Sequence, residues 1–307
     1  MDDRSGTTGR VAEDGAPDGA PDGIGAFLRS RRARLRPEDV GLPVTGRHRR
    51  VPGLRREELA QLAGVSVAYL TRLEQDRGDN VSDEVLDAIA RALRLSANER
   101  AHLVHLARSR HRRGRTPSGQ RQVRASLRGM LDAMEDVPAY VTGWRSDILA
   151  WNRMAAALFG DWDRMPPEER NWVRLLFLEP GHRELFADWE ARAADAVGAL
   201  RLDAGGHLDD PSLAELVDEL SARSPEFRRL WGTHDVKEQS HGVRRLRHPV
   251  AGDLDLAFES FRLPDDSEQC LTVYHAPQGS AAVENLRLLA SWGAGASASG
   301  APPRRPR

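Results

Sequence analysis

The chain has 307 residues, of which 40% are hydrophobic and 30% are charged, and its only cysteine is Cys270. This composition excludes an internal disulfide and a cysteine-based zinc finger. The sequence contains no run of about 18 apolar residues that would cross a membrane. Its acidic N-terminus lacks the basic start and the apolar stretch of a signal peptide. We therefore expect a cytoplasmic protein of about two domains.

Charge is distributed unevenly along the chain, although the net charge is -1. Residues 24–124 carry a net charge of +11 with no lysine, whereas residues 125–307 carry -8 and the first 23 residues carry -4. A basic block followed by an acidic block favours a nucleic-acid-binding half joined to a half with another task. Chance clustering stays open as an alternative, because arginine supplies every basic residue except Lys237.

Low-complexity segments suggest where the domains begin and end. Residues 1–23 contain the repeat GAPDGAPDG, and residues 293–307 are mostly Gly, Ala, Ser, Pro and Arg, so both are predicted to be disordered tails. The string HRRGRTPSGQRQ has few apolar residues and is typical of a linker. We predict an N-terminal domain over residues 24–110, a linker over 111–124 and a C-terminal domain over 125–292.

The N-terminal domain is predicted to be all-α. Residues 24–35 form an amphipathic helix, and the Gly-, Pro- and Arg-rich residues 37–53 form a long loop. Helical patterns then follow at residues 54–63, 66–75, 82–93 and 96–108. Ser82 is placed to cap one of these helices, and Ser96 with Glu99 forms a capping box before another.

The segment 54–78 carries the strongest functional signal. Its first helix has an apolar stripe that ends at Ala63, Gly64 supplies a left-handed turn, and Ser66 caps the next helix. Leu70 and Leu73 face inward on that second helix. Two helices joined by a short turn that contains glycine indicate a helix-turn-helix.

The outer face of the second helix suits the major groove of DNA. Small side chains at its start allow close approach to the bases, and Arg72 is able to donate two hydrogen bonds to guanine. Side chains at helix N-termini are placed to hold phosphates. A plain helical hairpin and a solvated Arg72 are the alternatives. The candidate DNA-binding residues are Arg56, Ser66, Val67, Ala68, Thr71, Arg72 and Gln75.

The C-terminal domain is predicted to be α+β. Residues 138–151 indicate two short strands around a turn, and Asn152 is placed to cap a short helix. The remaining pattern predicts helices at 167–178, 182–200 and 211–223, strands at 243–249, 254–263 and 270–275, and a last helix at 281–289.

Aromatic side chains gather in this half and are able to line an apolar pocket for a small molecule. A place in the domain core is the common alternative for each of them. The candidate ligand-binding residues are Trp144, Trp151, Phe159, Phe177, Phe258 and Tyr274.

Other site chemistries have weaker support. Three histidines spaced seven apart suggest a metal or haem site, but Gly242 and Pro249 argue against the continuous helix that this spacing needs. We predict no metal and no cofactor. The sequence has no P-loop, no Gly-x-Gly-x-x-Gly, no Gly-x-Ser-x-Gly and no His-Glu-x-x-His, so we do not expect an enzyme. The residues concerned in the metal alternative are His234, His241, His248, Cys270 and His275.

The strings RVPGLRREELAQLAGVS and RLEQDRG resemble the XRE, or lambda-repressor-like, family, and within it the MmyB-like regulators. The resemblance covers residues 24–108 strongly and 125–290 more loosely. It implies a five-helix DNA-binding domain, with residues 66–75 as the recognition helix, and a PAS-like C-terminal domain for a fatty-acid-like ligand. Many members carry Gln at the positions of Val67 and Ala68, so their operators do not transfer to this chain.

The combined expectation is a transcription regulator that binds double-stranded DNA. A homodimer would place two recognition helices about one helical turn apart on a near-palindromic site. A small hydrophobic ligand in the C-terminal domain would shift the population able to bind DNA. The alternative is a regulator or antitoxin whose C-terminal domain binds a protein partner.

Overall fold

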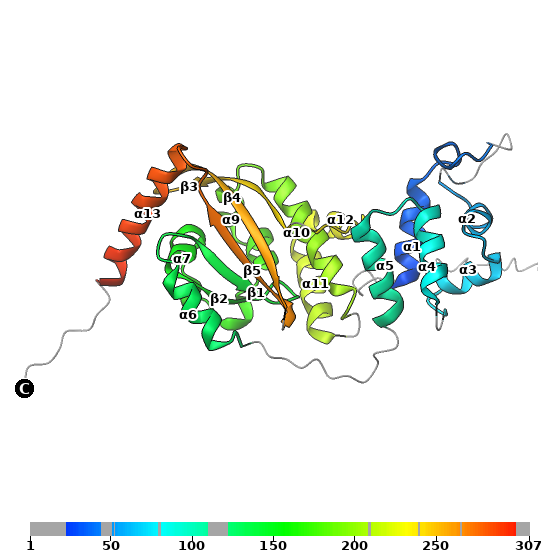
Figure 1. Ribbon diagram of the computed structural model, residues 1–307, viewed down its shortest axis with the longest axis horizontal. Helices are drawn as coiled ribbons and strands as arrows, with labels where there is room; N and C mark the ends of the chain where they lie inside the picture. Colours follow the sequence, from blue (N-terminus) through cyan, green and yellow to red (C-terminus); the bar gives the residue numbers. More distant parts are fainter. Residues whose placement is uncertain are drawn as a thin grey trace, which may run out of the picture.

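The computed structural model describes residues 23–43, 51, 53–78, 81–109, 122–207, 210–238, 240–264 and 266–298. Figure 1 shows a helical N-terminal domain at one end and a C-terminal domain of helices around a sheet at the other. The predicted disordered tail over 1–23 and the predicted linker over 111–124 lie almost entirely outside the described residues.

The N-terminal domain consists of short helices whose ends follow the capping signals in the sequence. The hydroxyl of Ser66 accepts a hydrogen bond from the amide of Tyr69, and Ser82 does the same for Val85. Ser96 and Glu99 cap each other reciprocally, as predicted. The described helices are α1 (Ile24–Arg34), a 3₁₀ turn (Pro37–Val40), α2 (Arg56–Ala63), α3 (Val67–Glu74), α4 (Asp83–Ala92) and α5 (Ala97–Ser109).

The C-terminal domain is built on an antiparallel sheet in the order β2-β1-β5-β4-β3. Tyr140 of β1 lies opposite Thr272 of β5, and Tyr274 of β5 lies opposite Phe258 of β4, so these aromatic residues share the central strands. The strands are β1 (Ala139–Thr142), β2 (Ile148–Trp151), β3 (His241–His248), β4 (Gly252–Leu263) and β5 (Asp266–His275).

Helices cover both faces of this sheet. On one face, α6 packs Leu127 and Leu131 against Ala139 and Leu271. On the other face, helices that follow β2 build the main aromatic core together with α13. The helices of this domain are α6 (Ala125–Ala133), α7 (Arg153–Phe159), α8 (Trp172–Leu178), α9 (Pro180–Leu185), α10 (Trp189–Ala204), α11 (Pro211–Arg223), α12 (Pro225–Trp231) and α13 (Ala281–Ala298), with 3₁₀ turns at Trp162–Arg164 and Pro167–Glu169.

The structure divides or extends several helices that the sequence pattern predicted. The predicted helix over 167–178 is two elements, because the side chain of Asn171 caps α8 and starts it afresh. The predicted helix over 182–200 is also two, because Phe186 forms a bridge to Leu246 between them. Helix α12 was not predicted, and α13 continues to Ala298, past the expected start of the C-terminal tail.

Within the described parts of the chain, no helix is both long enough and apolar enough to span a membrane.

Candidate DNA-binding surface and ligand cavity

Helix α3 presents its outer face to solvent. Ser66, Val67, Ala68, Arg72 and Gln75 are exposed, whereas Leu70 and Leu73 on the opposite side are fully buried. Thr71 is half-buried and its hydroxyl donates to the carbonyl of Val67 at 2.8 Å. The amphipathic division predicted for this helix is therefore the one observed.

A buried carboxylate fixes α3 to the rest of the domain. Glu74 at the end of α3 is 1% exposed, and its two oxygens accept from Nε of Arg32 at 2.8 Å and from Nε of Arg56 at 2.7 Å. Arg29 also donates to the carbonyl of Glu74. Because α1, α2 and α3 all meet at this residue, the direction in which α3 projects is set by charge pairing as well as by apolar packing.

Sequence reasoning did not identify Glu74. The signal that would have found it is its place on the inward stripe after Leu70 and Leu73, since a carboxylate on a buried face needs a partner. Glu74 also forms an ion pair with Arg56, which was expected to contact phosphate. Its side chain is 37% exposed, and its Nε is engaged by Glu74.

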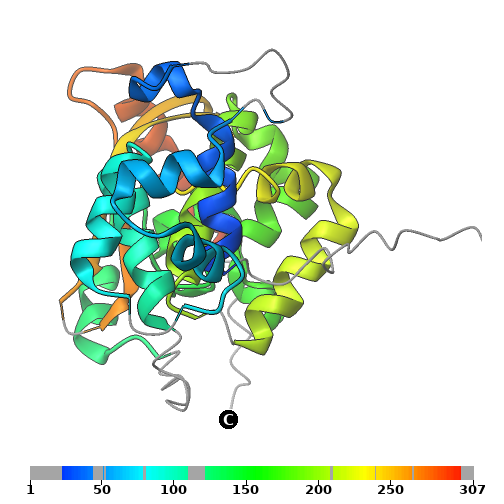
Figure 2. The same ribbon diagram turned by 90° about the vertical axis from the view of Figure 1, so that its right-hand side faces the viewer.

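Helix α3 lies on the side of the N-terminal domain away from the C-terminal domain. Figure 1 places α2 and α3 at the outer end, with α5 nearer the C-terminal domain. Figure 2 is a view from that end, and the blue and cyan helices of the N-terminal domain stand in front. Docking of the two domains therefore leaves this end open.

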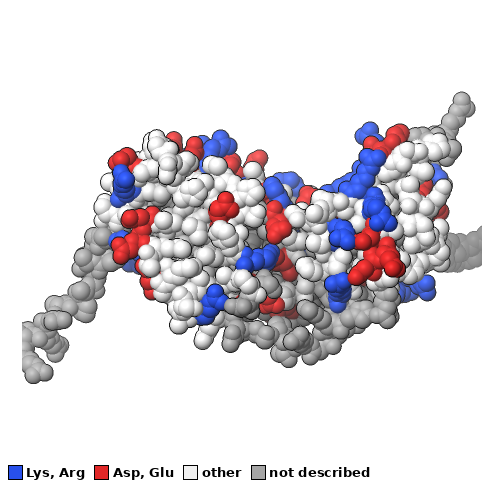
Figure 3. Space-filling model, in the orientation of Figure 1, with Lys and Arg blue, Asp and Glu red and all other residues white. Residues whose placement is uncertain are grey.

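The basic character of the N-terminal half is only partly carried by the described surface. In Figure 3, acidic and basic side chains are interspersed on the visible face of the N-terminal domain. Eight of the 22 arginines in residues 24–124 lie outside the described residues, among them Arg47, Arg49 and Arg50.

The C-terminal domain holds a cavity of about 140 Å³ between the sheet and α10. Its apolar wall is aromatic: Tyr140, Trp172, Phe258 and Tyr274 all line it. The hydroxyls of Tyr140 and Tyr274 are 3.5 Å apart, and burial raises the pKa of Tyr140 well above its usual value. The phenol of Tyr140 is therefore a neutral hydrogen-bonding group in this cavity.

Charged residues line the other wall of the cavity. Arg244 of β3 pairs with Asp195 of α10, with 3.3 Å between Nη1 and Oδ2, and its guanidinium lies 4.4 Å from the ring centroid of Phe258. Burial and the nearby Arg192 lower the pKa of Arg244. Among the described residues, Nε of Arg192 and Nε1 of Trp172 are buried without a hydrogen-bond partner. Such donors favour a ligand with an acceptor group.

The residues predicted to bind a ligand are divided among three environments. Phe258 and Tyr274 line the cavity, whereas Trp151, Phe159 and Phe177 pack in or against hydrophobic cores. Trp144 stacks on His207, with ring centroids 3.9 Å apart, beside a separate hollow between the domains. Tyr140 and Trp172, aromatic residues of this half outside the candidate list, also line the cavity, and sequence reasoning missed its charged lining residues, which include Arg192, Asp195, Lys237 and Arg244.

The histidines that suggested a metal site have other contacts. Nδ1 of His248 accepts from the amides of Val250 and Ala251, which leaves Nε2 to donate to the carbonyl of Ala157. His234 contacts Arg201. Within the described residues, no group of three His, Cys, Asp or Glu side chains is arranged to hold a metal ion.

Comparison with known families agrees with both halves of this architecture. Residues 24–103 match a helix-turn-helix domain family. Residues 123–289, more than half of the chain, match the MmyB-like transcription regulator ligand binding domain. The chain belongs to the MmyB-like transcription regulators. No curated protein sequence matches it.

The cavity of this MmyB-like regulator lies entirely within the matched ligand-binding region, between Tyr140 and Tyr274. Helix α3, with its exposed outer face, lies within the matched helix-turn-helix region. The protein is thus a DNA-binding transcription regulator with a ligand-binding domain. Both matched families are regulator domains, not enzymes.

Proposed function

We propose that this regulator reads a specific DNA sequence through α3 as a homodimer. The observation that carries the proposal is the rigid presentation of α3, whose outer face is exposed while Glu74 pins its far end to α1 and α2. A helix held in this way enters the major groove with a defined orientation. The domain limits proposed are 24–110 for DNA binding, as a five-helix domain, and 125–292 for ligand binding.

Individual residues take distinct parts in this proposal. Arg72 reads a guanine, and the small side chains of Val67 and Ala68 contact thymine methyl groups. Ser66 and Arg56 hold phosphates and set the register without reading sequence. Thr71 and Gln75 complete the exposed contact face.

The ligand proposed for the cavity is a small molecule with an apolar body and one acidic group. The aromatic wall suits the apolar body, and the buried donors of Arg192 and Trp172 suit a carboxylate. A PAS-like fold for the domain is supported by its antiparallel sheet with helices inserted between β2 and β3. A fatty-acid-like ligand, as the resemblance implies, has both features.

Two measurements test these roles. Selection of binding sites from random DNA, followed by fluorescence anisotropy, should return a near-palindrome with half-sites about one helical turn apart. Equal affinity for selected and scrambled DNA would refute sequence-specific regulation.

Native mass spectrometry with straight-chain carboxylates of four to six carbons, which suit a cavity of about 140 Å³, should show one acid per chain. A co-purified protein in place of an acid would favour the alternative of a protein-binding C-terminal domain.

A further inference from the structure

Residues 232–238, which connect α12 to β3 and are here named the strap, reach out of the C-terminal domain into the N-terminal domain. The carboxylate of Asp235 pairs with Arg34 at 2.6 Å and with Arg31 at 3.6 Å. The strap carbonyls of Thr233 and His234 also accept from these two arginines. Val236 packs against the hydrophobic core of the N-terminal domain. The strap thus forms part of the wall of the DNA-binding domain.

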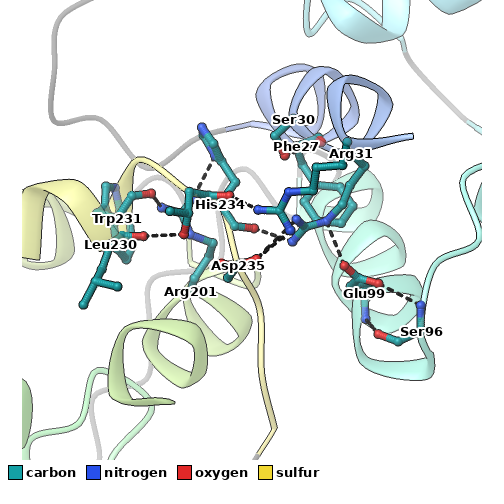
Figure 4. A network of polar contacts seen from close by, with 12 residues as sticks. Phe27, Ser30, Arg31, Ser96, Glu99, Arg201, Leu230, Trp231, His234 and Asp235 are labelled. Carbon is teal, nitrogen blue, oxygen red and sulfur yellow. Dashed lines mark hydrogen bonds and ion pairs between the residues drawn. The ribbon is translucent and has the colours of Figure 1, made fainter. Parts of the chain in front are cut away.

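Arg31 makes this contact specific. Its side chain is 3% exposed, and its Nε also pairs with Glu99 of α5 at 2.9 Å. Figure 4 shows Arg31 between Glu99 on one side and the strap on the other. A buried guanidinium requires all of its charged partners, because losing one leaves an uncompensated charge. Displacement of the strap therefore acts directly on the junction of α1 and α5.

Lys237, which follows Val236 in the strap, connects the strap to the ligand cavity. Nζ of Lys237 lies 2.5 Å from Oδ1 of Asp195, and its amide donates to the carbonyl of Gly198 at 3.2 Å. A β-carbon on Gly198 would lie 2.9 Å from that of Lys237, so the strap packs tightly along α10. The second oxygen of Asp195 pairs with Arg244 inside the cavity.

Arg201 of α10 holds the N-terminal end of the strap, where it follows α12. Arg201 bonds Nδ1 of His234 at 2.9 Å, donates to the carbonyl of Trp231 and lies 4.0 Å from the ring centroid of Trp231. Figure 4 shows Arg201 and Arg31 on opposite sides of His234. Three consecutive strap residues thus face, in turn, two arginines of α1, the N-terminal core and a carboxylate of the cavity.

We propose that the strap transmits occupancy of the cavity to the DNA-binding domain through Asp195 and Lys237. This inference rests on the proposed binding of an acid in the cavity. An acid that binds Arg192 and Arg244 competes with Asp195 for Arg244 and repels its carboxylate. Asp195 then moves together with Lys237, and the strap loosens its hold on α1. Two docked recognition helices of a dimer would lose their fixed spacing.

The first experiment needs no ligand. In a full-length Cys270→Ser background, spin labels at exposed positions 84 on α4 and 218 on α11 report the distance between the domains. Lys237→Met should raise the undocked population about twofold to fivefold, the effect expected for a half-exposed ion pair. Asp195→Asn should act in the same direction. Glu219→Gln, which breaks an ion pair away from the strap, is the matched control and should leave the distances unchanged.

The second experiment uses hexanoate as the probe. The acid should raise the undocked population of the parent protein, whereas Asp235→Asn, which breaks the contact of the strap with α1 outside the cavity, should bind hexanoate equally well by native mass spectrometry without any response in distance. Binding without a response in the parent protein would overturn the proposal, as would an undiminished response in Asp235→Asn. If no carboxylate binds, the ligand assignment fails, and Lys237→Met and Asp195→Asn still decide the role of the strap.

Discussion

Glu74 of α3 and Arg32 of α1 form an ion pair, with 2.8 Å between Oε1 and Nε. Arg56 of α2 binds the other oxygen of the same carboxylate. Because Glu74 is the last residue of α3, its two partners tie that helix to both α1 and α2. The pair links the stability of the domain to the direction in which α3 projects.

Glu74→Gln should lower the free energy of unfolding of the N-terminal domain by about 1–3 kcal/mol, because two charge-assisted hydrogen bonds lose their anion. Urea unfolding followed by circular dichroism measures this change. Glu57→Gln, at an exposed position of α2, is the control and should cost a few tenths of a kcal/mol at most. Equal effects of the two substitutions would refute the anchoring role.

Gly64→Ala should destabilise the N-terminal domain by about 1 kcal/mol. Gly64 has a φ of 66°, and no atom lies within 4 Å of the added β-carbon, so the cost is backbone strain alone. Gly129→Ala in α6 is a matched control, since it also adds a β-carbon in open space but in a helix. Gly129→Ala should stabilise the C-terminal domain by about 0.5–1 kcal/mol. Thermal melting should therefore give a lower melting temperature for Gly64→Ala and a higher one for Gly129→Ala.

Arg72→Ala should weaken operator binding by about 1–3 kcal/mol and relax selectivity at one base pair. Fluorescence anisotropy on the selected site and on its single-base variants measures both effects. Arg56→Ala should instead weaken specific and random DNA alike and also reduce stability through Glu74. An equal loss on random DNA for Arg72→Ala would assign that residue to the phosphates.

Arg192→Met should lower the affinity for a straight-chain carboxylate about tenfold, since it removes a charge-assisted donor from the cavity. Isothermal titration calorimetry with hexanoate gives the affinity. Arg183→Met, on the exposed surface of α9, provides the control. An unchanged affinity in Arg192→Met would place the acidic group elsewhere.

His102 should make the fold sensitive to acid. It packs edge-on against Phe27, and burial together with the nearby Arg201 lowers its pKa from 6.5 to about 3. Above pH 6.5, His102 is neutral in both the folded and the unfolded chain. Between pH 6.5 and about pH 3, His102 binds a proton in the unfolded chain but not in the folded chain. The free energy of unfolding therefore falls by up to about 1.4 kcal/mol per pH unit.

Chemical unfolding at pH 7.5 and pH 5.0 tests this dependence. His102→Gln should lose much of the decline and keep the share from His182, whose pKa is also lowered by burial, to about 4. His241→Gln, at an exposed position of β3, should retain the full decline. A decline of the same size in His102→Gln would contradict the assignment.

Local signals were sufficient to predict the helix-turn-helix. The glycine turn, the Ser66 cap and the inward leucines all lie within about a dozen residues, and each acts on its own neighbours. The same local character explains why Asn152 and Ser82 were recognised as caps. Asn171 and Ser224 cap α8 and α12 by the same kind of local hydrogen bond, but they were not recognised from the sequence, so the predicted helix over 167–178 was wrong and α12 was missed.

The sequence by itself therefore determined the helix-turn-helix, the exposed face of α3 and the α+β character of the second half. Only the tertiary structure decided which buried charges meet. Asp195 and Arg244 are 49 residues apart, and Arg31 and His234 are 203 apart. Periodicity tells which face of a helix or strand is buried, but it carries no information about the partner on the other side. Sheet register and domain docking supply that partner, and the cavity and the strap depend on both.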